Sequence, residues 1–213
     1  MDGNNRWGKK NKSTTYYSYK KGAEKIFKLS EYIFKNYNIN TVSAFALSYH
    51  NLKRPPKIIN NLIKIIDELC NQIINKFNDE FRIKFLGDFN FLPKNIYLKL
   101  IQIEKINKNK KKKLVIFLNY SGQIDILNSA LKLKNKKNKP SLKNFEKNLS
   151  TFSLPNPDLI IRTGGYQRLS DFMLYQISFC DFIFSKKLWP DYQISDLNRN
   201  IKEYYKIEKK FGK

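Results

Sequence analysis

Residues 160–174 read IIRTGGYQRLSDFML, and the rest of the chain can be arranged around this stretch. The apolar run predicts the end of a buried strand, residues 162–165 predict a turn, and an apolar helix is predicted from Ser170. A glycine pair lets backbone N–H groups face an anion, and a helix N-terminus favours negative charge. Because Arg162 and Arg168 present planar forks of donors that grip phosphate oxygens, the stretch predicts an anion site. The alternative is an ordinary strand-to-helix connection with surface arginines.

Length and composition favour one soluble domain. The chain has 213 residues, 41% hydrophobic and 15% aromatic, enough to bury one sizeable core, so we expect a single domain over residues 1–213. Cys70 and Cys180 lie in apolar surroundings without paired spacing or a histidine cluster, as free thiols do in a reducing compartment. The sequence shows neither a secretory signal nor an apolar run of roughly 18 residues. We therefore expect a cytoplasmic protein.

The type of basic residue is more informative than the net charge of +23, which would ordinarily suggest nucleic acid or an anionic membrane. Of the 41 basic residues, 35 are Lys and six are Arg, in a chain also rich in Asn and Ile. The codons of Lys, Asn and Ile are AT-rich, so we attribute the Lys to a base bias that filled neutral surface positions. Four of the six arginines lie inside the motifs described here: Arg6, Arg54, Arg162 and Arg168.

Strand-like and helix-like segments alternate along the chain. Apolar runs bounded by turn signals predict strands at residues 41–47, 81–86, 114–118, up to 162, and 180–184. Helical spacing of apolar residues predicts helices at residues 22–37 and 56–77, and from residues 93, 124, 170 and 196. Residues 132–140 are expected to form a solvated loop. The alternation predicts an α/β fold with a mainly parallel β-sheet flanked by helices, whose ligands bind beyond the C-terminal strand ends.

Three motifs place polar groups at such strand ends. MDGNNRW at residues 1–7 puts the carboxylate of Asp2 beside Arg6, residues 48–55 read SYHNLKRP, and the third motif is the 160–174 stretch. A carboxylate among phosphate-gripping arginines is expected where Mg²⁺ bridges a diphosphate to the protein. Asp181 is a second candidate carboxylate.

Six motifs, in order over essentially the whole chain, resemble those of the cis-prenyltransferases. The motifs are MDGN-x-RW at 1–7, S-x-x-N-x-x-RP at 48–55, FLGD at 85–88, NYSG at 119–122, RTGG-x-x-R-x-S at 162–170 and LWPD at 188–191. The resemblance implies an enzyme that condenses isopentenyl diphosphate successively onto an allylic diphosphate such as farnesyl diphosphate. The implied product is a long-chain polyprenyl diphosphate such as undecaprenyl diphosphate, the lipid carrier precursor for cell-wall synthesis.

The same resemblance implies further structural properties. They are a homodimer, Mg²⁺ as cofactor, and a hydrophobic tunnel between the sheet and the helices at 22–37 and 56–77. Its partners would be the two diphosphate substrates and no nucleic acid. The product would be delivered to the membrane, so the implied localisation is cytoplasmic, with a peripheral membrane contact left open.

Site residues are carried over position by position from the resemblance. Asp2 matches the family's essential Mg²⁺-associated aspartate, and Asn51 matches the asparagine proposed to help remove the isopentenyl proton. Asp181 stands where the family has a Mg²⁺-binding Glu. The other candidates are implied to bind substrate: Gly3, Asn4, Asn5, Arg6, Trp7, Thr15, Tyr19, Ser48, Tyr49, His50, Leu52, Arg54, Arg162, Arg168, Leu169 and Ser170.

Several positions depart from the family's pattern. Asn5 replaces a glycine, although Asn tolerates positive φ better than most residues. The family often has Arg at Thr15, His at Tyr19, Glu at His50, Trp at Leu52 and a Glu-His pair at Tyr166 and Gln167. His50 is the chain's only histidine. One interpretation makes it a general base, and the other treats it as drift of a loop residue.

Two other classes of function stay open from the sequence. A non-catalytic subunit of a heteromeric cis-prenyltransferase would resemble the enzyme, but such subunits usually lack the N-terminal Asp motif and the RTGG arginines. A basic nucleic-acid-binding protein is favoured by bulk charge alone, without a helix-turn-helix, zinc or RNP-like motif.

The family ordinarily carries an apolar strand immediately before its MDGN motif. Without such a strand, its neighbours in the sheet would expose unpaired edges, and Asp2 would lie on a frayed terminus. We therefore expect an upstream start and roughly 15 to 25 further residues that include a short apolar strand.

Overall fold

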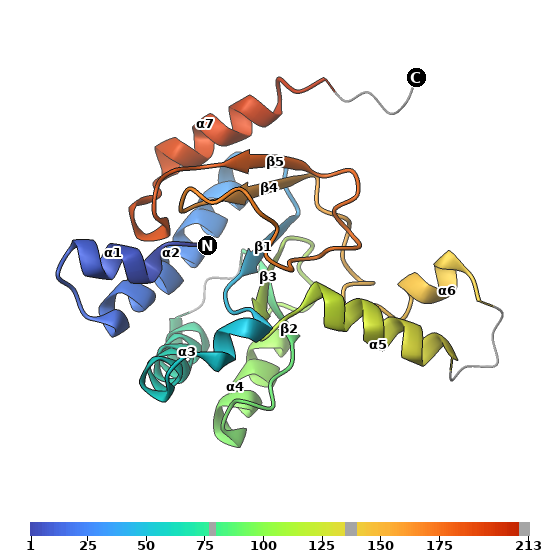
Figure 1. The fold of residues 1–213 in the computed structure, drawn as a ribbon, viewed down its shortest axis with the longest axis horizontal. Helices are drawn as coiled ribbons and strands as arrows, with labels where there is room; N and C mark the ends of the chain where they lie inside the picture. Colours follow the sequence, from blue (N-terminus) through green and yellow to red (C-terminus); the bar gives the residue numbers. More distant parts are fainter. Residues whose placement is uncertain (77–79, 135–139, 209–213) are drawn as a thin grey trace.

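The computed structural model describes residues 1–76, 80–134 and 140–208 (Figure 1). Its helices are α1 (Asn4–Lys10), α2 (Thr15–Asn36), α3 (Pro56–Lys76), α4 (Lys94–Lys105), α5 (Gly122–Lys134), α6 (Leu142–Glu146) and α7 (Ile194–Tyr204), with 3-10 turns η1 (Tyr49–Lys53) and η2 (Trp189–Asp191). Its strands are β1 (Thr41–Phe45), β2 (Arg82–Gly87), β3 (Lys113–Leu118), β4 (Leu159–Arg162) and β5 (Asp181–Phe184). The predicted alternation of strands and helices is confirmed as far as β4, but no helix lies between β4 and β5.

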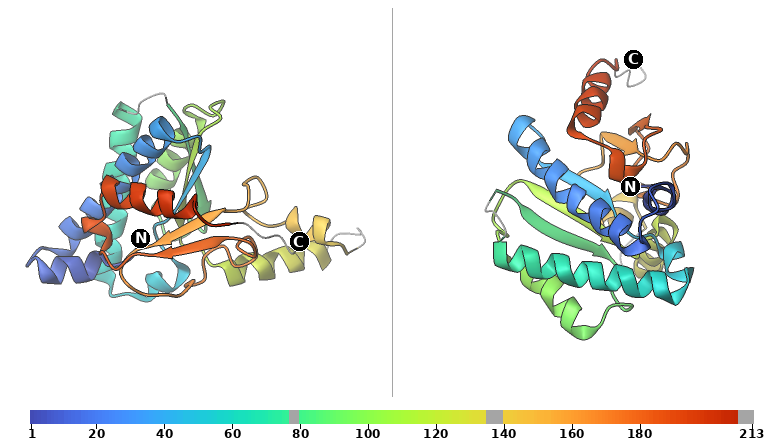
Figure 2. Two further views of the ribbon diagram at one scale, coloured as in Figure 1. Left: turned by 90° about the horizontal axis from the view of Figure 1, so that it is seen from above. Right: turned by 90° about the vertical axis from the view of Figure 1, so that its left-hand side faces the viewer.

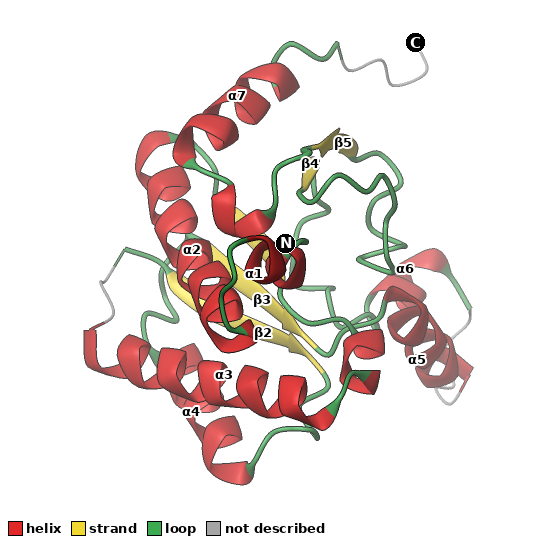
Figure 3. Ribbon diagram, turned by 60° about the vertical axis from the view of Figure 1, so that its left-hand side comes forward, coloured by secondary structure: helices red, strands yellow, loops and turns green. Residues whose placement is uncertain are grey.

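The strands form two parallel sheets. The first has the order β1-β3-β2, and the second pairs β4 with β5, in the register Leu159 to Asp181 and Arg162 to Phe184. Figure 3 shows the two sheets apart, with β4 and β5 away from β2 and β3. All paired strands are parallel, as predicted, but the single sheet expected from the sequence is divided between β1 and β4.

Alternation along β3 creates a core on each face of the first sheet. Leu114, Ile116 and Leu118 belong to the cluster packed under α2, α3 and α4, whereas Val115 and Phe117 belong to the cluster formed with residues 172–182. Successive side chains of a strand point to opposite faces, which explains the division. Helices α2 and α3 lie side by side over the first face (Figure 2).

The helix predicted from Ser170 is wrong, because residues 170–179 form turns and bends. Ser170, Asp171 and Met173 have φ of 53°, 64° and 47°, which a right-handed helix cannot contain. The apolar spacing that suggested a helix instead serves burial: Met173 and Ile177 pack against Phe117 on the second face of the sheet.

Other boundaries differ where polar caps decide the helix ends. Helix α2 begins at Thr15 because the Thr14 side chain accepts the N–H of Tyr17, so the helix extends before the apolar spacing that starts near residue 22. The sequence did not predict α1 or α6. Helix α5 includes residues 132–134 of the expected loop, while residues 135–139, and Phe77 at the expected end of α3, lie outside the described residues.

We predict that core truncation in β3 destabilises the protein much more than truncation on α4. Leu114 is 0% exposed and Leu98 is 54% exposed. Leu114→Ala should lower the free energy of unfolding by about 2–5 kcal/mol, because it leaves a cavity. Leu98→Ala should change it by about 0.5 kcal/mol or less. Denaturant unfolding measures both, and equal losses would contradict the assignment of β3 to the core.

Candidate functional site

The N-terminal motif is fastened to the end of β4 through the backbone of Asp2. The Asp2 N–H donates to Oγ1 of Thr163 at 3.0 Å, and the Asp2 carbonyl accepts the N–H of Trp189 at 2.9 Å. Thr163 is 1% exposed and follows β4 directly. The motif therefore lies at the C-terminal strand ends, as predicted, although the sequence analysis had assigned Thr163 no role.

Two arginines hold the carboxylate of Asp2. Arg6 Nη2 lies 3.4 Å from Oδ1, and Arg162 Nη2 lies 3.1 Å from Oδ2. Arg6 also donates to the carbonyl of Gly164 at 2.7 Å. The Asp2 side chain keeps 32% of its surface exposed, so a ligand can still reach this carboxylate. The structure thus joins the first and third motifs in one cluster.

Arg162 organises the third motif. Its Nη1 donates to Oγ of Ser170 at 2.8 Å and to the carbonyl of Arg168. Its Nε is buried and has no hydrogen-bond partner among the described residues. Arg168 and Ser170 are exposed beside it. A buried donor without a partner is costly, so this end of β4 is suited to bind an anion.

The ring of Tyr166 contacts two arginines of the cluster. The guanidinium of Arg6 lies 4.6 Å from the centroid of its ring and that of Arg168 lies 4.3 Å from it. An aromatic face attracts guanidinium groups without neutralising them. The sequence analysis noted Tyr166 only as a departure from the family's pattern. An aromatic residue between two motif arginines is the signal that could have identified it.

The glycine pair has a different role from the one predicted. Gly164 and Gly165 have φ of 91° and 82°, but their N–H groups donate to the carbonyls of Lys187 and Ser185 at 2.7 and 2.9 Å. These two donors are therefore not directed at an anion. Glycine is needed at Gly164 because a Cβ would lie 2.7 Å from Nη2 of Arg6 and 3.1 Å from atoms of Asp2.

The segment expected to be a diphosphate-binding loop is the start of helix α1. Gly3, with φ of 103°, precedes the helix, and Asn4, Asn5 and Arg6 form its first turn. Oδ1 of Asn4 is buried and has no partner among the described residues. Trp7 is 6% exposed and its indole N–H donates to Asp191 at 2.6 Å, so Trp7 packs and the substrate contact predicted for it is not supported.

The second motif lies at the C-terminal end of β1, where a bridge between Ser48 and Tyr120 leads into η1. Nη1 of Arg54 donates to the hydroxyl of Tyr19 at 2.7 Å. Burial raises the pKa of Tyr19 above its usual value, and the charge of Arg54 opposes this rise. Leu52 packs against the core. Between the described residues, no hydrogen bond joins Thr15 to Arg54.

The second motif also faces the third. Nε2 of His50 lies 3.9 Å from Oδ2 of Asp171, and that oxygen is buried without a hydrogen-bond partner among the described residues. Asn51, Arg168 and Leu169 line the same cavity as Asp2 and Arg162. Tyr49 is exposed, and its ring lies 5.8 Å from that of His50. The structure therefore gathers side chains of all three motifs.

Asp181 lies apart from this cluster. It pairs with Leu159 at the start of the second sheet, whereas Asp2 is fastened beyond Arg162 at the other end. Three strand residues separate these levels, about 10 Å at about 3.3 Å per residue. Within one chain, Asp2 and Asp181 therefore do not meet at one metal ion, and the role predicted for Asp181 finds no support in the single chain.

A single accessible carboxylate, that of Asp2, is compatible with a Mg²⁺ site whose other ligands come from the substrate phosphates. No cluster of three or more His, Cys, Asp or Glu occurs in the described part of the chain. However, Mg²⁺ is commonly held by one or two carboxylates together with substrate phosphates. Burial lowers the pKa of the Met1 α-amino group to about 6, with Asp2 opposing and Arg162 adding to the effect.

The chain is similar to known proteins over essentially its whole length. The model of the family described as "Putative undecaprenyl diphosphate synthase" matches residues 1–212. "Dehydrodolichyl diphosphate synthase 3" of Arabidopsis thaliana is 33% identical over all of this chain and 74% of its own length. An "Isoprenyl transferase" of Rickettsia typhi is also 33% identical, over all of this chain and 95% of its own length.

Solved structures show the same fold. The structure of lavandulyl diphosphate synthase from Lavandula x intermedia, in complex with dimethylallyl diphosphate, has a TM-score of 0.89 and 25% identity over 100% of this chain and 95% of that one. A probable undecaprenyl diphosphate synthase from Campylobacter jejuni has a TM-score of 0.79 and 30% identity over 91% and 92% of the two chains. The chain therefore belongs to the undecaprenyl diphosphate synthase family of cis-prenyltransferases, the family that its six motifs resemble.

Proposed function

We propose that this prenyltransferase condenses isopentenyl diphosphate successively onto farnesyl diphosphate and releases a long-chain polyprenyl diphosphate such as undecaprenyl diphosphate. The observation that carries the proposal is the Asp2 carboxylate between Arg6 and Arg162, with Arg168 and Ser170 alongside. One accessible carboxylate among several guanidiniums suits two diphosphate groups that meet at the same strand ends.

The arginines would hold the diphosphates and spread the charge of the leaving group. As the allylic C–O bond breaks, negative charge grows on the departing diphosphate, and fixed donors aimed at it lower the barrier. Arg162 ends β4, Arg168 lies in the loop that follows it, and Arg6 comes from α1, so the donors approach from different parts of the chain. Mg²⁺ held by Asp2 and diphosphate oxygens would supply further neutralisation.

The second motif would act on the isopentenyl substrate. Asn51 lines the cavity that also contains Asp2 and Ser170, so its amide can reach a substrate bound there. As the new C–C bond forms, the isopentenyl unit loses a proton from the carbon beside the cationic centre, and the C–H electrons form the new double bond. We propose that Asn51 helps to remove this proton. His50 can be either a general base or a substituted loop residue, because its acidic partner, Oδ2 of Asp171, lies 3.9 Å from Nε2.

The growing hydrocarbon would enter the space between α2, α3 and the first sheet. An apolar cavity of about 90 Å³ lies there, lined by Ile26, Leu62, Ile65, Leu69, Phe85 and Ile116. This is about the share of three water molecules in the liquid, so it holds only part of an isoprenoid chain. We propose that α2 and α3 separate as the product lengthens.

A homodimer and transfer of the product to the membrane complete the proposal. Helix α5 exposes an apolar stripe, with Ile124, Leu127 and Leu131 36%, 58% and 50% exposed at i, i+3 and i+7 spacing. Such a stripe supports a subunit contact on α5. Among the described residues no helix has the length and apolarity to cross a membrane, so we propose peripheral delivery of the product.

The proposal is tested by incubating purified protein with Mg²⁺, labelled isopentenyl diphosphate and one primer at a time. Dimethylallyl, farnesyl and geranylgeranyl diphosphates should be compared, with chain length read by thin-layer chromatography. We expect long-chain product, fastest from farnesyl diphosphate. A non-catalytic subunit would give none, while short products from another primer would contradict the proposed specificity.

We predict that the planar fork of donors on the arginines contributes to substrate binding in addition to their positive charge. Arg162→Lys or Arg168→Lys should raise the KM for isopentenyl diphosphate roughly tenfold or more, because Lys keeps the charge and loses bidentate binding. Arg82→Lys and Arg199→Lys are matched controls, since Arg82 donates to the carbonyl of Lys108 and Arg199 to the carboxylate of Asp196, both outside the candidate site. Steady-state kinetics at fixed primer checks this, and similar KM values in all four variants would contradict it.

We predict that Asp2→Ala lowers kcat about 100-fold or more, while the affinity for the allylic substrate falls much less. The carboxylate acts on charge that develops during the reaction. The contacts that fasten residue 2 use backbone groups, so the variant should keep its fold. Single-turnover kinetics and primer titration separate the two effects. Full activity of the variant at saturating Mg²⁺ would exclude the role.

We predict that Tyr166 acts as a positioning residue through its ring. Tyr166→Leu removes the aromatic ring that Arg6 and Arg168 contact and should raise the KM for the diphosphate substrates about fivefold, given about 0.5–1 kcal/mol for each exposed cation–π contact. Tyr166→Phe keeps the face and should behave like the parent. If Phe impaired binding as much as Leu, the hydroxyl rather than the ring would be responsible.

A further inference from the structure

The loop of residues 168–173, which carries Arg168 and Ser170, is held in an unusual backbone conformation. Ser170, Asp171 and Met173 have φ of 53°, 64° and 47°, in the left-handed region that residues with side chains seldom adopt. Such a conformation is costly and persists only where the surrounding contacts impose it. The contacts of the 168–173 loop therefore fix where Ser170 lies beside Arg162.

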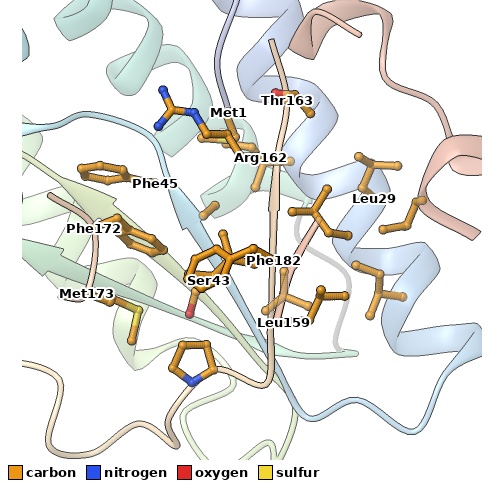
Figure 4. A pocket seen from close by; sticks show the side chains of 18 of the residues that line it. Met1, Leu29, Ser43, Phe45, Leu159, Arg162, Thr163, Phe172, Met173 and Phe182 are labelled. Carbon is orange, nitrogen blue, oxygen red and sulfur yellow. The ribbon is translucent and has the colours of Figure 1, made fainter. Parts of the chain in front are cut away.

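One of these contacts is apolar and holds the end of the loop. The ring of Phe172 stacks on that of Phe45 in β1, with centroids 4.6 Å apart and an angle of 18° between the planes. Figure 4 shows the two rings side by side, with Met173 below them. This packing does not by itself set the direction of the polar residues that precede Phe172, so the loop requires a second anchor.

Asp171 supplies that anchor at the first turn of α5. Its backbone carbonyl accepts the N–H of Gly122 at 2.8 Å, and its Oδ1 accepts the N–H of Gln123 at 2.9 Å. The first N–H groups of a helix have no partner within it, and a helix N-terminus favours a negative charge. The approach is close, because a Cβ on Gly122 would lie 3.2 Å from the carbonyl oxygen of Asp171.

The residues just before α5 are in turn fastened to the second motif. The N–H of Tyr120 donates to the carbonyl of Leu47 at 3.2 Å, and its carbonyl accepts the N–H of Tyr49 at 3.0 Å. Tyr120 and Gly122 belong to the NYSG motif at residues 119–122, to which the proposed function gives no role. This motif therefore links the segment that precedes Asn51 to the loop that carries Ser170.

The second carboxylate oxygen of Asp171 faces the second motif directly. Oδ2 is buried and has no hydrogen-bond partner among the described residues, and Nε2 of His50 lies 3.9 Å from it. The Asp171 side chain is 12% exposed. A buried carboxylate oxygen without a partner is costly, and a nearby N–H or positive charge offsets that cost. The imidazole of His50 is therefore placed to stabilise Asp171.

We propose that Asp171 is a positioning residue for the isopentenyl diphosphate site and that His50 is its partner. Asp171 holds the loop of Arg168 and Ser170 against α5, and its pairing with His50 draws this loop toward the segment that carries Asn51. The identity of the ligand rests on the proposed function, whereas the anchoring rests on the contacts of Asp171. His50 then acts through Asp171 and not as a general base.

The first test removes the anchor without forbidding the backbone conformation. Asp171→Gly deletes the carboxylate and allows positive φ, while Asp171→Asn keeps an acceptor at Oδ1 and also tolerates positive φ. Ser141→Gly is a matched control, because the Ser141 hydroxyl accepts the N–H of Asn144 at 3.2 Å at the start of α6, outside the candidate site. The measurements are calorimetric titration with inorganic pyrophosphate and steady-state kinetics with isopentenyl diphosphate.

We expect Asp171→Gly to weaken pyrophosphate binding and to raise the KM for isopentenyl diphosphate about tenfold, as for loss of a hydrogen bond to a charged group. The kcat should change much less than the KM. Asp171→Asn should retain most of the affinity, and Ser141→Gly should leave binding unchanged. Amide hydrogen exchange of Gly122 and Gln123 should become faster in Asp171→Gly, since their acceptor loop is released.

The second test concerns the partner. His50→Glu places a carboxylate opposite that of Asp171 and should weaken pyrophosphate binding about fivefold, because like charges about 4 Å apart repel by about 1 kcal/mol even in water. The double variant His50→Glu, Asp171→Asn removes this repulsion and should bind like Asp171→Asn alone. An equal loss with Asp or Asn at position 171 would show that Glu acts on the ligand directly, and it would overturn the pairing.

Two further results would overturn the role of Asp171. One is an unchanged KM and pyrophosphate affinity in Asp171→Gly despite faster exchange at Gly122 and Gln123, which would leave Asp171 as a cap of α5 only. The other is unchanged exchange at both amides. Pyrophosphate binding and amide exchange require no turnover. A parent protein that makes no product, but loses pyrophosphate affinity in Asp171→Gly, would therefore contradict the proposed function and leave the positioning role intact.

Discussion

The two hydrogen bonds to the backbone of Asp2 fix the arrangement on which the site depends. They join residue 2 to Thr163 and Trp189, which lie more than 160 residues away in the sequence. Because neither bond uses the carboxylate, the side chain is free to face Arg6 and Arg162. Rigid support of a catalytic group by its backbone is what precise charge placement requires.

Electrostatics in the cluster are dominated by guanidinium groups. One carboxylate pairs with both Arg6 and Arg162, and the ring of Tyr166 contacts Arg6 and Arg168 without neutralising them. The site therefore retains net positive charge, which suits the diphosphate substrates that we propose. The many surface lysines add a diffuse field that salt screens, so they contribute little to this local arrangement.

Local patterns predicted most of the scaffold. All five strands and the helices α2, α3, α4, α5 and α7 occur near their predicted places, because apolar periodicity reports burial directly. The prediction failed where periodicity and backbone geometry disagree. Met173 and Ile177 are spaced as in a helix but lie in turns, since Ser170, Asp171 and Met173 adopt positive φ. Short helices such as α1 carry too few residues to produce a periodic signal.

The sequence by itself determined the class of fold, the family and the residues that carry charge, because the order of the motifs and the types of the residues can be read directly from it. Tertiary structure decided how those residues meet. Only packing shows that the N–H groups of Gly164 and Gly165 donate to the carbonyls of Lys187 and Ser185, respectively. It also shows that Trp7 is buried and that Asp181 lies at the opposite end of the second sheet from Asp2. These facts depend on strand register and on contacts between distant segments, which no local pattern encodes.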